Sequence, residues 1–559
     1  MSKLRVNQLS PNDDSVVINV AGIISKDNLS SHDTGQGDSL IAVKLDAIGS
    51  VERTQHQKNA DVLTAEDFGA IGDGQLHRLS EKFLTLVSAQ AVYPHVTSLT
   101  QSIDWAALQA AVNYSGLTGA GVKLLSHYVI NAPIKISNAG VQLNGWRAWS
   151  FGARISTPSD YNDLVFDITA TSSLSNFKIK GPTTVQSSNV LVSVTDTNAV
   201  RLDNMFYESG YRQVLLKGTS FYISIDNSDF YGSLYSALET SSSTYAGVDF
   251  IMTHSRFLAA TGAYIVCLNG LGSAVMSNVQ ASVNKVTQAT LYFGTPAGGF
   301  GGCQMNNCVW ENDGDISATA IAAVYINGSS SARWKSIWFD NCIITGNAVP
   351  AVLMFWHTGV KFSNCGLSST SAVGVVYFNA SGQTTGTSFD NCEWSTNGSN
   401  APIRFGAVSK GDVTLTNCSY IGANSFVDVA SAPYASIAQV NVMNCFLGSG
   451  STPVTKTSDG YWPNGQVLTT GHQLGGFTKV TATISTDASG NASFAHNVFN
   501  AQKRVALLTV VSKGSSGEAV GASTVTLKVD GGSVFVVGGP ASGKVRITAL
   551  FNEAEDSGW

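Results

Sequence analysis

The chain has 559 residues and a formal net charge of −6; 13% of its residues are charged and 55 are glycine. This charge argues against a nucleic-acid partner. The N-terminus shows no apolar signal segment, and no run of about 20 apolar residues could span a bilayer, so membrane insertion is not expected. Low charge and high glycine content are typical of a turn-rich β protein, and no motif calls for a cofactor.

Residues 1–60 are polar and contain only short alternating runs, such as residues 15–20. A stretch of this kind is too small to build a convincing core of its own. We therefore expect a leader that is disordered or docks on a partner.

Residues 61–145 contain a specific motif, Asp67 to Gly74, which reads DFGAIGDG. It resembles the DFGAxGDG signature that opens pectate-lyase-like β-helices. An amphipathic helix capped by Asp104 is predicted to follow, up to Val112. The strands at 121–125 and 128–130 resemble the family's GGxVxLPxGxY segment without its proline. The helix is expected to cover the open end of a solenoid.

Residues 146–450 contain a repeat whose marker is an asparagine followed by a cysteine. Six such pairs begin at Asn307, Asn341, Asn364, Asn391, Asn417 and Asn444, with gaps of 34, 23, 27, 26 and 27 residues. With the cysteine relaxed, the same slot recurs at Asn176, Asn204, Asn227, His254 and Asn278. A period in the twenties indicates a solenoid.

The residues around each slot describe one coil of a right-handed parallel β-helix. Apolar residues four and two places before the asparagine predict a strand, and asparagine tolerates the left-handed backbone of a tight turn. Stacked coils lie about 4.8 Å apart, so the asparagine amides are expected to bond in a ladder. The eight cysteines are interpreted as reduced core residues, because no C-x-x-C spacing favours a metal site.

The C-terminal part of the chain has a different pattern. Residues 451–475 are rich in glycine, serine, threonine and proline and are interpreted as a connector. Residues 476–559 alternate short apolar runs with turns. This spacing predicts a β-sandwich.

The order of these segments resembles the tailspike depolymerases of tailed bacteriophages. The resemblance implies a homotrimer on the virion tail, assembled in the host cytoplasm and acting at the bacterial surface. Residues 1–60 would attach it to another phage tail protein, and the C-terminal domain would trimerise the spike or bind glycan. The implied partner is a bacterial capsular or O-antigen polysaccharide.

Cleaving such a polymer by hydrolysis requires two carboxylates about 5 to 10 Å apart. The aspartates directly before the asparagine slot are interpreted as turn caps. The longest coil, from Asn307 to Asn341, carries the first candidate cluster. Its proposed acid and base are Glu311 and Asp313, and its proposed sugar contacts are Trp310 and Asp315. The alternatives are a solvated acidic turn or a calcium site, although the spacing is not that of a full calcium loop.

The second candidate cluster lies on the coils at Asn204, Asn227 and His254. Its proposed catalytic residues are Glu208 and Asp229, and its proposed substrate contacts are Tyr231, Arg256 and Glu239, the last on a loop of the same coil. Column alignment makes Asp229 and Arg256 direct neighbours, and the alternative interpretation is a surface ion pair. Trp394 is a further candidate sugar contact, whereas His254 is interpreted as a turn residue rather than a catalyst.

Three functions remain open from the sequence, and hydrolysis is favoured because carboxylate clusters are the stronger signal. A lyase would need a base and a cation instead, which Tyr231, Arg256 and His357 could supply. A non-catalytic spike that only grips the polymer has the same fold. A secreted pectin-type lyase is disfavoured by the missing signal peptide and the extra terminal domains.

Overall fold

The computed structural model describes most of residues 36–447, and beyond residue 447 it describes strands. The gaps after residue 60 are 147–151, 242–247, 270–271, 283–284, 295–300, 313–319, 331, 380–382, 397–400, 407–409, 421–423, 425, 429–436 and 444. The chain divides into two units, Met1–Leu63 and Thr64–Trp559. Within the described residues, no helix is long and apolar enough to cross a membrane.

The first unit contains little regular structure in its described part. It holds the short helices η2 (Gly37–Leu40) and α2 (Gln55–Asn59) and the antiparallel strands β1 (Ala42–Val43) and β2 (Arg53–Thr54). Strand β3 (Val62–Thr64) spans the boundary with the second unit.

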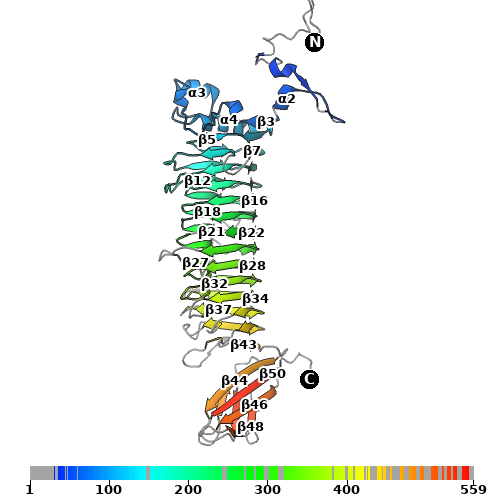
Figure 1. Cartoon of the computed structure of the whole chain (residues 1–559), viewed down its shortest axis with the longest axis vertical. Helices are drawn as coiled ribbons and strands as arrows, with labels where there is room; N and C mark the ends of the chain where they lie inside the picture. The colour runs from blue at the N-terminus through cyan, green and yellow to red at the C-terminus, as the bar shows by residue number, and fades with distance from the viewer. Residues whose placement is uncertain are drawn as a thin grey trace, which may run out of the picture. The chain divides into compact units, whose positions relative to one another are not determined.

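The second unit opens with a helical cap. Its helices are η3 (Glu66–Phe68), η4 (Leu79–Glu81), α3 (Leu86–Val92) and α4 (Ile103–Thr118), and they lie at one end of the stacked strands (Figure 1). The glycines of the DFGAIGDG motif adopt left-handed backbone, with φ of 90° at Gly69 and 68° at Gly72. Glycine is required there because other residues enter this region at an energetic cost.

The predicted capping helix forms, but its cap residue was assigned wrongly. Ser102 caps α4, and its hydroxyl accepts from the backbone N–H of Trp105 at 3.0 Å. Asp104 is buried instead, and its carboxylate accepts from the N–H groups of Ile71, Gly72 and Val129 at 2.7, 3.2 and 3.0 Å. Asp104 thus ties the motif loop to the first coil.

Three long parallel sheets follow, as predicted for a β-helix (Figure 1). Sheet 1 contains β4 (Gly121–Leu124), β7 (Val141–Gly145), β10 (Ser172–Ser175), β13 (Arg201–Asp203), β16 (Ser220–Asp226), β19 (Val248–Thr253), β22 (Ser273–Ser277), β25 (Gly301–Asn306), β28 (Trp334–Asp340), β31 (His357–Ser363), β34 (Gln383–Asp390), β37 (Lys410–Thr416), β40 (Ile437–Met443) and β43 (Gln466–Thr470). Each strand pairs in parallel with the strand of the next coil.

Sheets 2 and 3 have 13 strands each. Sheet 2 contains β5 (His127–Val129), β8 (Arg154–Ser156), β11 (Lys178–Lys180), β14 (Phe206–Glu208), β17 (Asp229–Tyr231), β20 (Arg256–Leu258), β23 (Gln280–Ala281), β26 (Val309–Asn312), β29 (Ile343–Gly346), β32 (Gly366–Ser369), β35 (Glu393–Thr396), β38 (Ser419–Tyr420) and β41 (Phe446–Leu447). Sheet 3 contains β6 (Ile134–Ile136), β9 (Leu164–Ile168), β12 (Val190–Thr195), β15 (Arg212–Lys217), β18 (Ser236–Ser241), β21 (Tyr264–Asn269), β24 (Ala289–Phe293), β27 (Ala322–Ile326), β30 (Val352–Met354), β33 (Val376–Phe378), β36 (Ile403–Phe405), β39 (Val427–Asp428) and β42 (Val454–Thr455).

The β-helix is longer at both ends than the repeat indicated. Its first strands lie at 121–145, within the segment assigned to the cap, because these coils lack the asparagine–cysteine pair. Strands β42 and β43 continue the parallel pairing into the segment interpreted as a connector. Parallel strand pairing, which depends on backbone geometry, therefore extends beyond the coils that carry the asparagine slot.

The C-terminal strands are antiparallel, as a β-sandwich requires. One sheet contains β44 (Phe477–Ser485), β46 (Val505–Lys513), β47 (Ala519–Val520) and β50 (Lys544–Asn552), and the other contains β45 (Ala492–Ala495), β48 (Thr526–Val529) and β49 (Ser533–Val537).

The core of the β-helix is built from like residues stacked on like. The rings of Phe339, Phe362 and Phe389 occupy one inward column of sheet 1, with centroids 4.8 and 4.7 Å apart. These separations match the spacing between hydrogen-bonded strands. Full burial of each such ring stabilises the fold by about 1.5–3 kcal/mol.

The predicted asparagine ladder is confirmed. Every described slot residue from Asn176 to Asn417 has a positive φ, between 46° and 62°. Five amides donate to the asparagine one coil earlier at 2.5–3.3 Å, those of Asn204, Asn227, Asn307, Asn341 and Asn391. Asn364 and Asn417 donate instead to Asp340 and Asp390. The aspartates before the slot therefore support the turns, as interpreted from the sequence.

All eight cysteines are free and buried. In the repeat, each thiol bonds the carbonyl two residues earlier, as Cys342 Sγ bonds Asp340 O at 3.3 Å. Burial also raises the pKa of Cys303 and Cys267 above the ordinary thiol value. These thiols are core residues rather than reactive groups.

Replacing Asn391 tests how the ladder stabilises the turns. Asn391→Ala is expected to lower the free energy of unfolding by about 2–3 kcal/mol, because it loses one hydrogen bond and forces alanine into left-handed backbone. Asn391→Gly keeps the backbone freedom and should lose only about 1 kcal/mol. Denaturant unfolding of both variants measures the difference, and equal destabilisation would contradict the role of the left-handed turn.

The state of the thiols is tested with Ellman's reagent. The folded protein is expected to react negligibly, because every thiol is buried, whereas the denatured protein should release signal for all 8 cysteines. Fewer reactive thiols after denaturation without reductant would reveal a disulfide. Rapid reaction of the folded protein would contradict the burial.

Candidate functional site

The outer face of sheet 2 carries a cluster of charges on successive coils. Two residue columns point outward here. Phe206 pairs in register with Asp229 and Asp229 with Arg256, while Lys180 pairs with Glu208 and Glu208 with Tyr231. Arg154 and Lys178 precede Phe206 in the first of these columns. We define the charged patch as the six charged side chains of the two columns: Arg154, Lys178, Lys180, Glu208, Asp229 and Arg256.

Glu208 is held between two lysines. Its carboxylate forms ion pairs with the ammonium groups of Lys178 and of Lys180, the latter at 2.9 Å. Glu208 is 21% exposed and Lys178 is 12% exposed. Burial acts to raise the pKa of Glu208, but the two ammonium groups outweigh it and lower that pKa below its usual value. Glu208 is therefore an ionised carboxylate at neutral pH.

Asp229 and Arg256 are direct neighbours, as column alignment predicted. The guanidinium donates to both carboxylate oxygens, Nε to Oδ1 at 2.8 Å and Nη2 to Oδ2 at 3.1 Å. A bidentate pair of this kind is stronger than a simple surface contact.

Glu208 and Asp229 lie on adjacent coils of the same outward face. Adjacent strands are about 4.8 Å apart and residues two apart on a strand about 6.6 Å, so their Cα atoms are separated by about 8 Å. Glycoside hydrolysis requires carboxyl groups about 5 to 10 Å apart, and two side chains on one face of adjacent strands at this Cα separation can place their carboxyl groups within that range.

Of the three carboxylates predicted to cluster on the longest coil, the structure describes only Glu311. Glu311 lies on β26 at an outward position, and Asp313 and Asp315 lie outside the described residues. Glu311 is four coils from Glu208 along one column, or about 19 Å. The two clusters therefore occupy different stretches of the same face.

In the coils after Glu311, the same column holds hydroxyl groups that the sequence analysis missed. Glu311 pairs in register with Thr345, which pairs with Ser368, which pairs with Ser395. The Thr345 and Ser368 hydroxyls lie 3.1 Å apart. Together with Asn347 and Thr370 they line a shallow polar groove of about 300 Å³, which we call the hydroxyl groove. Such a surface suits hydrogen bonding to sugar hydroxyls.

The assignment of Trp310 and Trp394 as sugar-binding residues is wrong. Trp310 is 0% exposed and Trp394 is also buried, because both occupy inward positions of sheet 2. The sequence carried the signal, because both tryptophans stand three places after a slot asparagine, the offset at which Phe230 is also buried. Tyr231, in contrast, is 46% exposed at the edge of the charged patch.

Glu239 does not lie on a loop beside Asp229. It lies on β18 in sheet 3, where its carboxylate accepts from Arg212 Nε at 2.7 Å and from the Ser236 hydroxyl at 2.9 Å. The Arg212 guanidinium also contacts the rings of Tyr211 and Tyr235. Glu239 therefore belongs to sheet 3, and its predicted place beside Asp229 on sheet 2 is wrong.

The two candidate histidines serve the scaffold. His357 is fully buried, and its ring bonds Phe355 O and Thr387 Oγ1 at 2.7 and 2.8 Å. Burial lowers the pKa of His357 to about 4, against the opposing bond to Phe355. It cannot serve a lyase as an accessible base. His254 replaces asparagine in the ladder, as interpreted, and lies between Asp226 and Asn278.

Lys178 and Lys180 are site residues that the sequence analysis overlooked. A signal was present, because they stand two and four places after Asn176, in the columns that hold Asp229 and Glu208. Their partnership with Glu208 becomes visible only when the columns are extended back by one coil.

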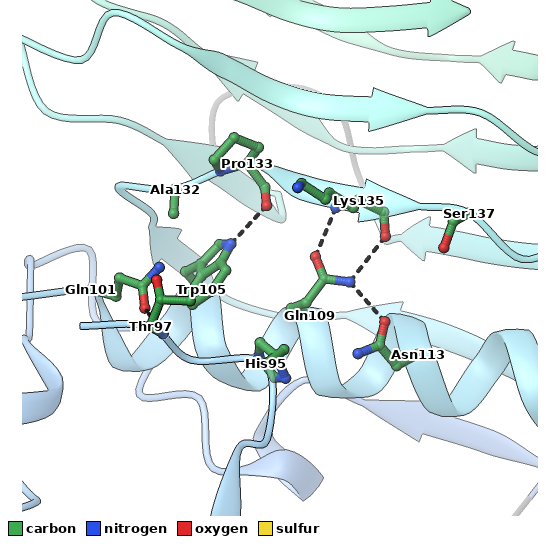
Figure 2. Close-up of a pocket in the computed structure, with 10 residues that line it drawn as sticks. All are labelled: His95, Thr97, Gln101, Trp105, Gln109, Asn113, Ala132, Pro133, Lys135 and Ser137. Atoms are coloured by element: carbon green, nitrogen blue, oxygen red, sulfur yellow. Dashed lines mark hydrogen bonds between the residues drawn. The ribbon is translucent and has the colours of Figure 1, made fainter. Parts of the chain in front are cut away.

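The cap contains a cavity of about 370 Å³ between α4 and β6 (Figure 2). Its polar groups largely bond one another. Gln109 Nε2 donates to Lys135 O at 2.9 Å and to Asn113 Oδ1 at 2.8 Å, and Trp105 Nε1 donates to Pro133 O at 2.8 Å. These bonds hold the cap helix on the first coil. We therefore interpret the cavity as part of the packing interface between the cap and the β-helix, not as a ligand site.

Comparison with solved structures supports the fold. A tailspike variant of E. coli bacteriophage HK620, in complex with a hexasaccharide, covers 94% of this chain and 98% of its own at 12% identity, with a TM-score of 0.54. The Pseudomonas phage phi297 tailspike (16% identity, 88% and 100% covered, TM-score 0.49) and a mannuronan C-5 epimerase A-module from Azotobacter vinelandii (13%, 73% and 100%, 0.42) also match. No protein-family model and no curated protein matches the sequence. At these identities the likeness shows the parallel β-helix.

Glu208→Gln tests the charge balance of the patch. The variant is expected to lose about 1–3 kcal/mol of stability at neutral pH, because Lys178 keeps its buried charge without its partner. The lowered pKa of Glu208 means that its contribution is present above the usual glutamate pKa and is lost as pH falls through the lowered value. Wild type and variant should therefore converge only below about pH 4.

Unfolding measured at neutral and acidic pH checks this prediction. Glu393→Gln, at an exposed position of the same sheet, is the matched control and should change little. A gap between wild type and Glu208→Gln that persists unchanged at low pH would contradict the assignment.

Proposed function

We propose that this protein is a bacteriophage tailspike that binds a bacterial surface polysaccharide along sheet 2 and cleaves it by glycosidic hydrolysis. The observation that carries the proposal is the placement of Glu208 and Asp229 on adjacent coils of one outward face. Both stand on paired strands, which hold a catalytic geometry more tightly than loops do. The likeness in fold to the tailspike in complex with a hexasaccharide supports it.

The two carboxylates would have different roles. Glu208, kept ionised by its lysines, suits the base or nucleophile. Asp229 would be the proton donor, but both its oxygens now accept from Arg256, so it must first take up a proton from solvent. Arg256 must therefore turn toward the substrate before Asp229 can reach the leaving oxygen. Since the Arg256 side chain is 45% exposed, it has room to do so.

The rest of the face would hold the polymer. Tyr231 offers an exposed ring at the edge of the patch, and Glu311 with the hydroxyl groove lies farther along the same columns. A chain laid along the stack would meet both regions, because the columns run parallel to the axis of the coils.

The assembly follows from the same proposal. The protein would act as a homotrimer on the virion tail, assembled in the host cytoplasm, and residues 1–60 would bind another phage tail protein. Capsule and O-antigen are the two candidate polymers, and both are surface polysaccharides.

Activity is tested on polysaccharides purified from strains that the protein binds. Wild type is expected to release new reducing ends, and Glu208→Gln or Asp229→Asn should lower kcat by about 10²–10⁴-fold, the usual contribution of an acid or base. Asp428→Asn is the matched control, because Asp428 forms a similar pair with Arg404 on sheet 3. Thermal unfolding of each variant separates lost chemistry from lost folding.

The outcomes distinguish the competing functions. Full activity in both variants would refute this pair, and loss confined to Glu311→Gln would move the chemistry to the hydroxyl groove. A product that absorbs as an unsaturated uronate would indicate a lyase. A polymer that is bound but never cut would indicate a non-catalytic receptor-binding spike.

A further inference from the structure

The charged patch carries more positive than negative charge. Its basic members are Arg154, Lys178, Lys180 and Arg256, and its acidic members are Glu208 and Asp229, which leaves an excess of two positive charges. The whole chain has a formal net charge of −6. A basic patch on a protein of negative net charge favours anionic ligands at that patch, whereas the protein as a whole does not attract them.

The excess is concentrated at the first coils of the patch. His127, Arg154 and Lys178 follow one another in a single column. Glu208 is shared by Lys178 and Lys180, so one negative charge faces two positive ones. Among the ion pairs in the described part of the chain, none involves Arg154. Asp73, which is paired in register with His127, is bound by His77 at 3.0 Å.

The pKa of His127 responds to the same charges. Burial lowers its pKa first, and Arg154, Lys180 and Lys178 lower it further, while Asp73 opposes them. The cations therefore dominate the field at this end of the face. An anionic group placed there would be stabilised by the same charges.

We infer that the bound polymer is an acidic polysaccharide whose carboxylate groups bind at Arg154 and Lys180 beside the Glu208–Asp229 pair. This inference rests on the proposed function and narrows its substrate class. A second carboxylate of the same polymer, several sugars along, would bind Arg256 and take the place of Asp229 there, since Arg256 is four coils, or about 19 Å, from Arg154. Both oxygens of Asp229 would then be released, and Asp229 could take up a proton from solvent, so the acidic substituent would prepare the proton donor as well as anchor the chain.

The test uses an array of bacterial capsular and O-antigen polysaccharides of known composition. Every polymer that the protein binds is expected to carry carboxylates, and reduction of those carboxylates to alcohols should abolish binding to the same backbone. Binding should also weaken steeply with added salt, because the contacts are charged.

Two variants locate the interaction. Arg154→Gln and Lys180→Gln are each expected to weaken binding to the acidic polymer by about tenfold, the usual effect of losing a charge-assisted bond. Their salt dependence should also be shallower. Lys335→Gln, which removes an exposed lysine from β28 of sheet 1, is the matched control and should bind as wild type.

The outcomes separate this inference from the function on which it rests. Binding and cleavage of a neutral polymer, or unchanged binding after carboxyl reduction, would overturn the acidic class and leave the depolymerase standing. Unchanged affinity in both patch variants would place the anion elsewhere and overturn the assigned site. Failure to bind any polysaccharide on the array would overturn the proposed function itself.

Discussion

The hydrogen-bonded spacing between successive coils is the constraint on which the rest of this structure depends. Parallel pairing places each residue about 4.8 Å from its counterpart in the next coil. The phenylalanine stack at 4.7 and 4.8 Å and the asparagine ladder repeat at this interval. A side chain in this fold is therefore judged by its column as much as by its neighbours in sequence.

The same spacing governs the charges. A charge on the outer face has its nearest neighbours one coil away, so a column either alternates in sign or accumulates unfavourable energy. Asp229 under Arg256 and Glu208 beside the two lysines satisfy this rule. Arg154 and Lys178 are consecutive in one column and do not. This exception is the observation on which the inferred binding of an anionic polymer rests.

The scaffold also explains why histidine and cysteine are poor guides to function here. His254 completes a turn ladder, and His357 bonds a backbone carbonyl in the core. The thiols fill the small space behind each turn. In a repetitive fold these residue types recur for packing reasons, and the informative residues are the charged ones that break the pattern.

The sequence alone determined the fold, because the turn marker recurs at the period of one coil and each slot must adopt left-handed backbone. It also determined that Asp229 adjoins Arg256, since equal offsets from the slot give equal register. It also places Trp310 and Trp394 in the core, because both stand three places after a slot residue, as the buried Phe230 does, so their assignment to the surface misread the column. Only the tertiary structure placed Glu239 on another sheet, because the number of residues per coil varies and sheet membership depends on where each bend falls. It also showed that Glu208 binds Lys178 of the neighbouring column as well as Lys180, which depends on side-chain conformation rather than on register.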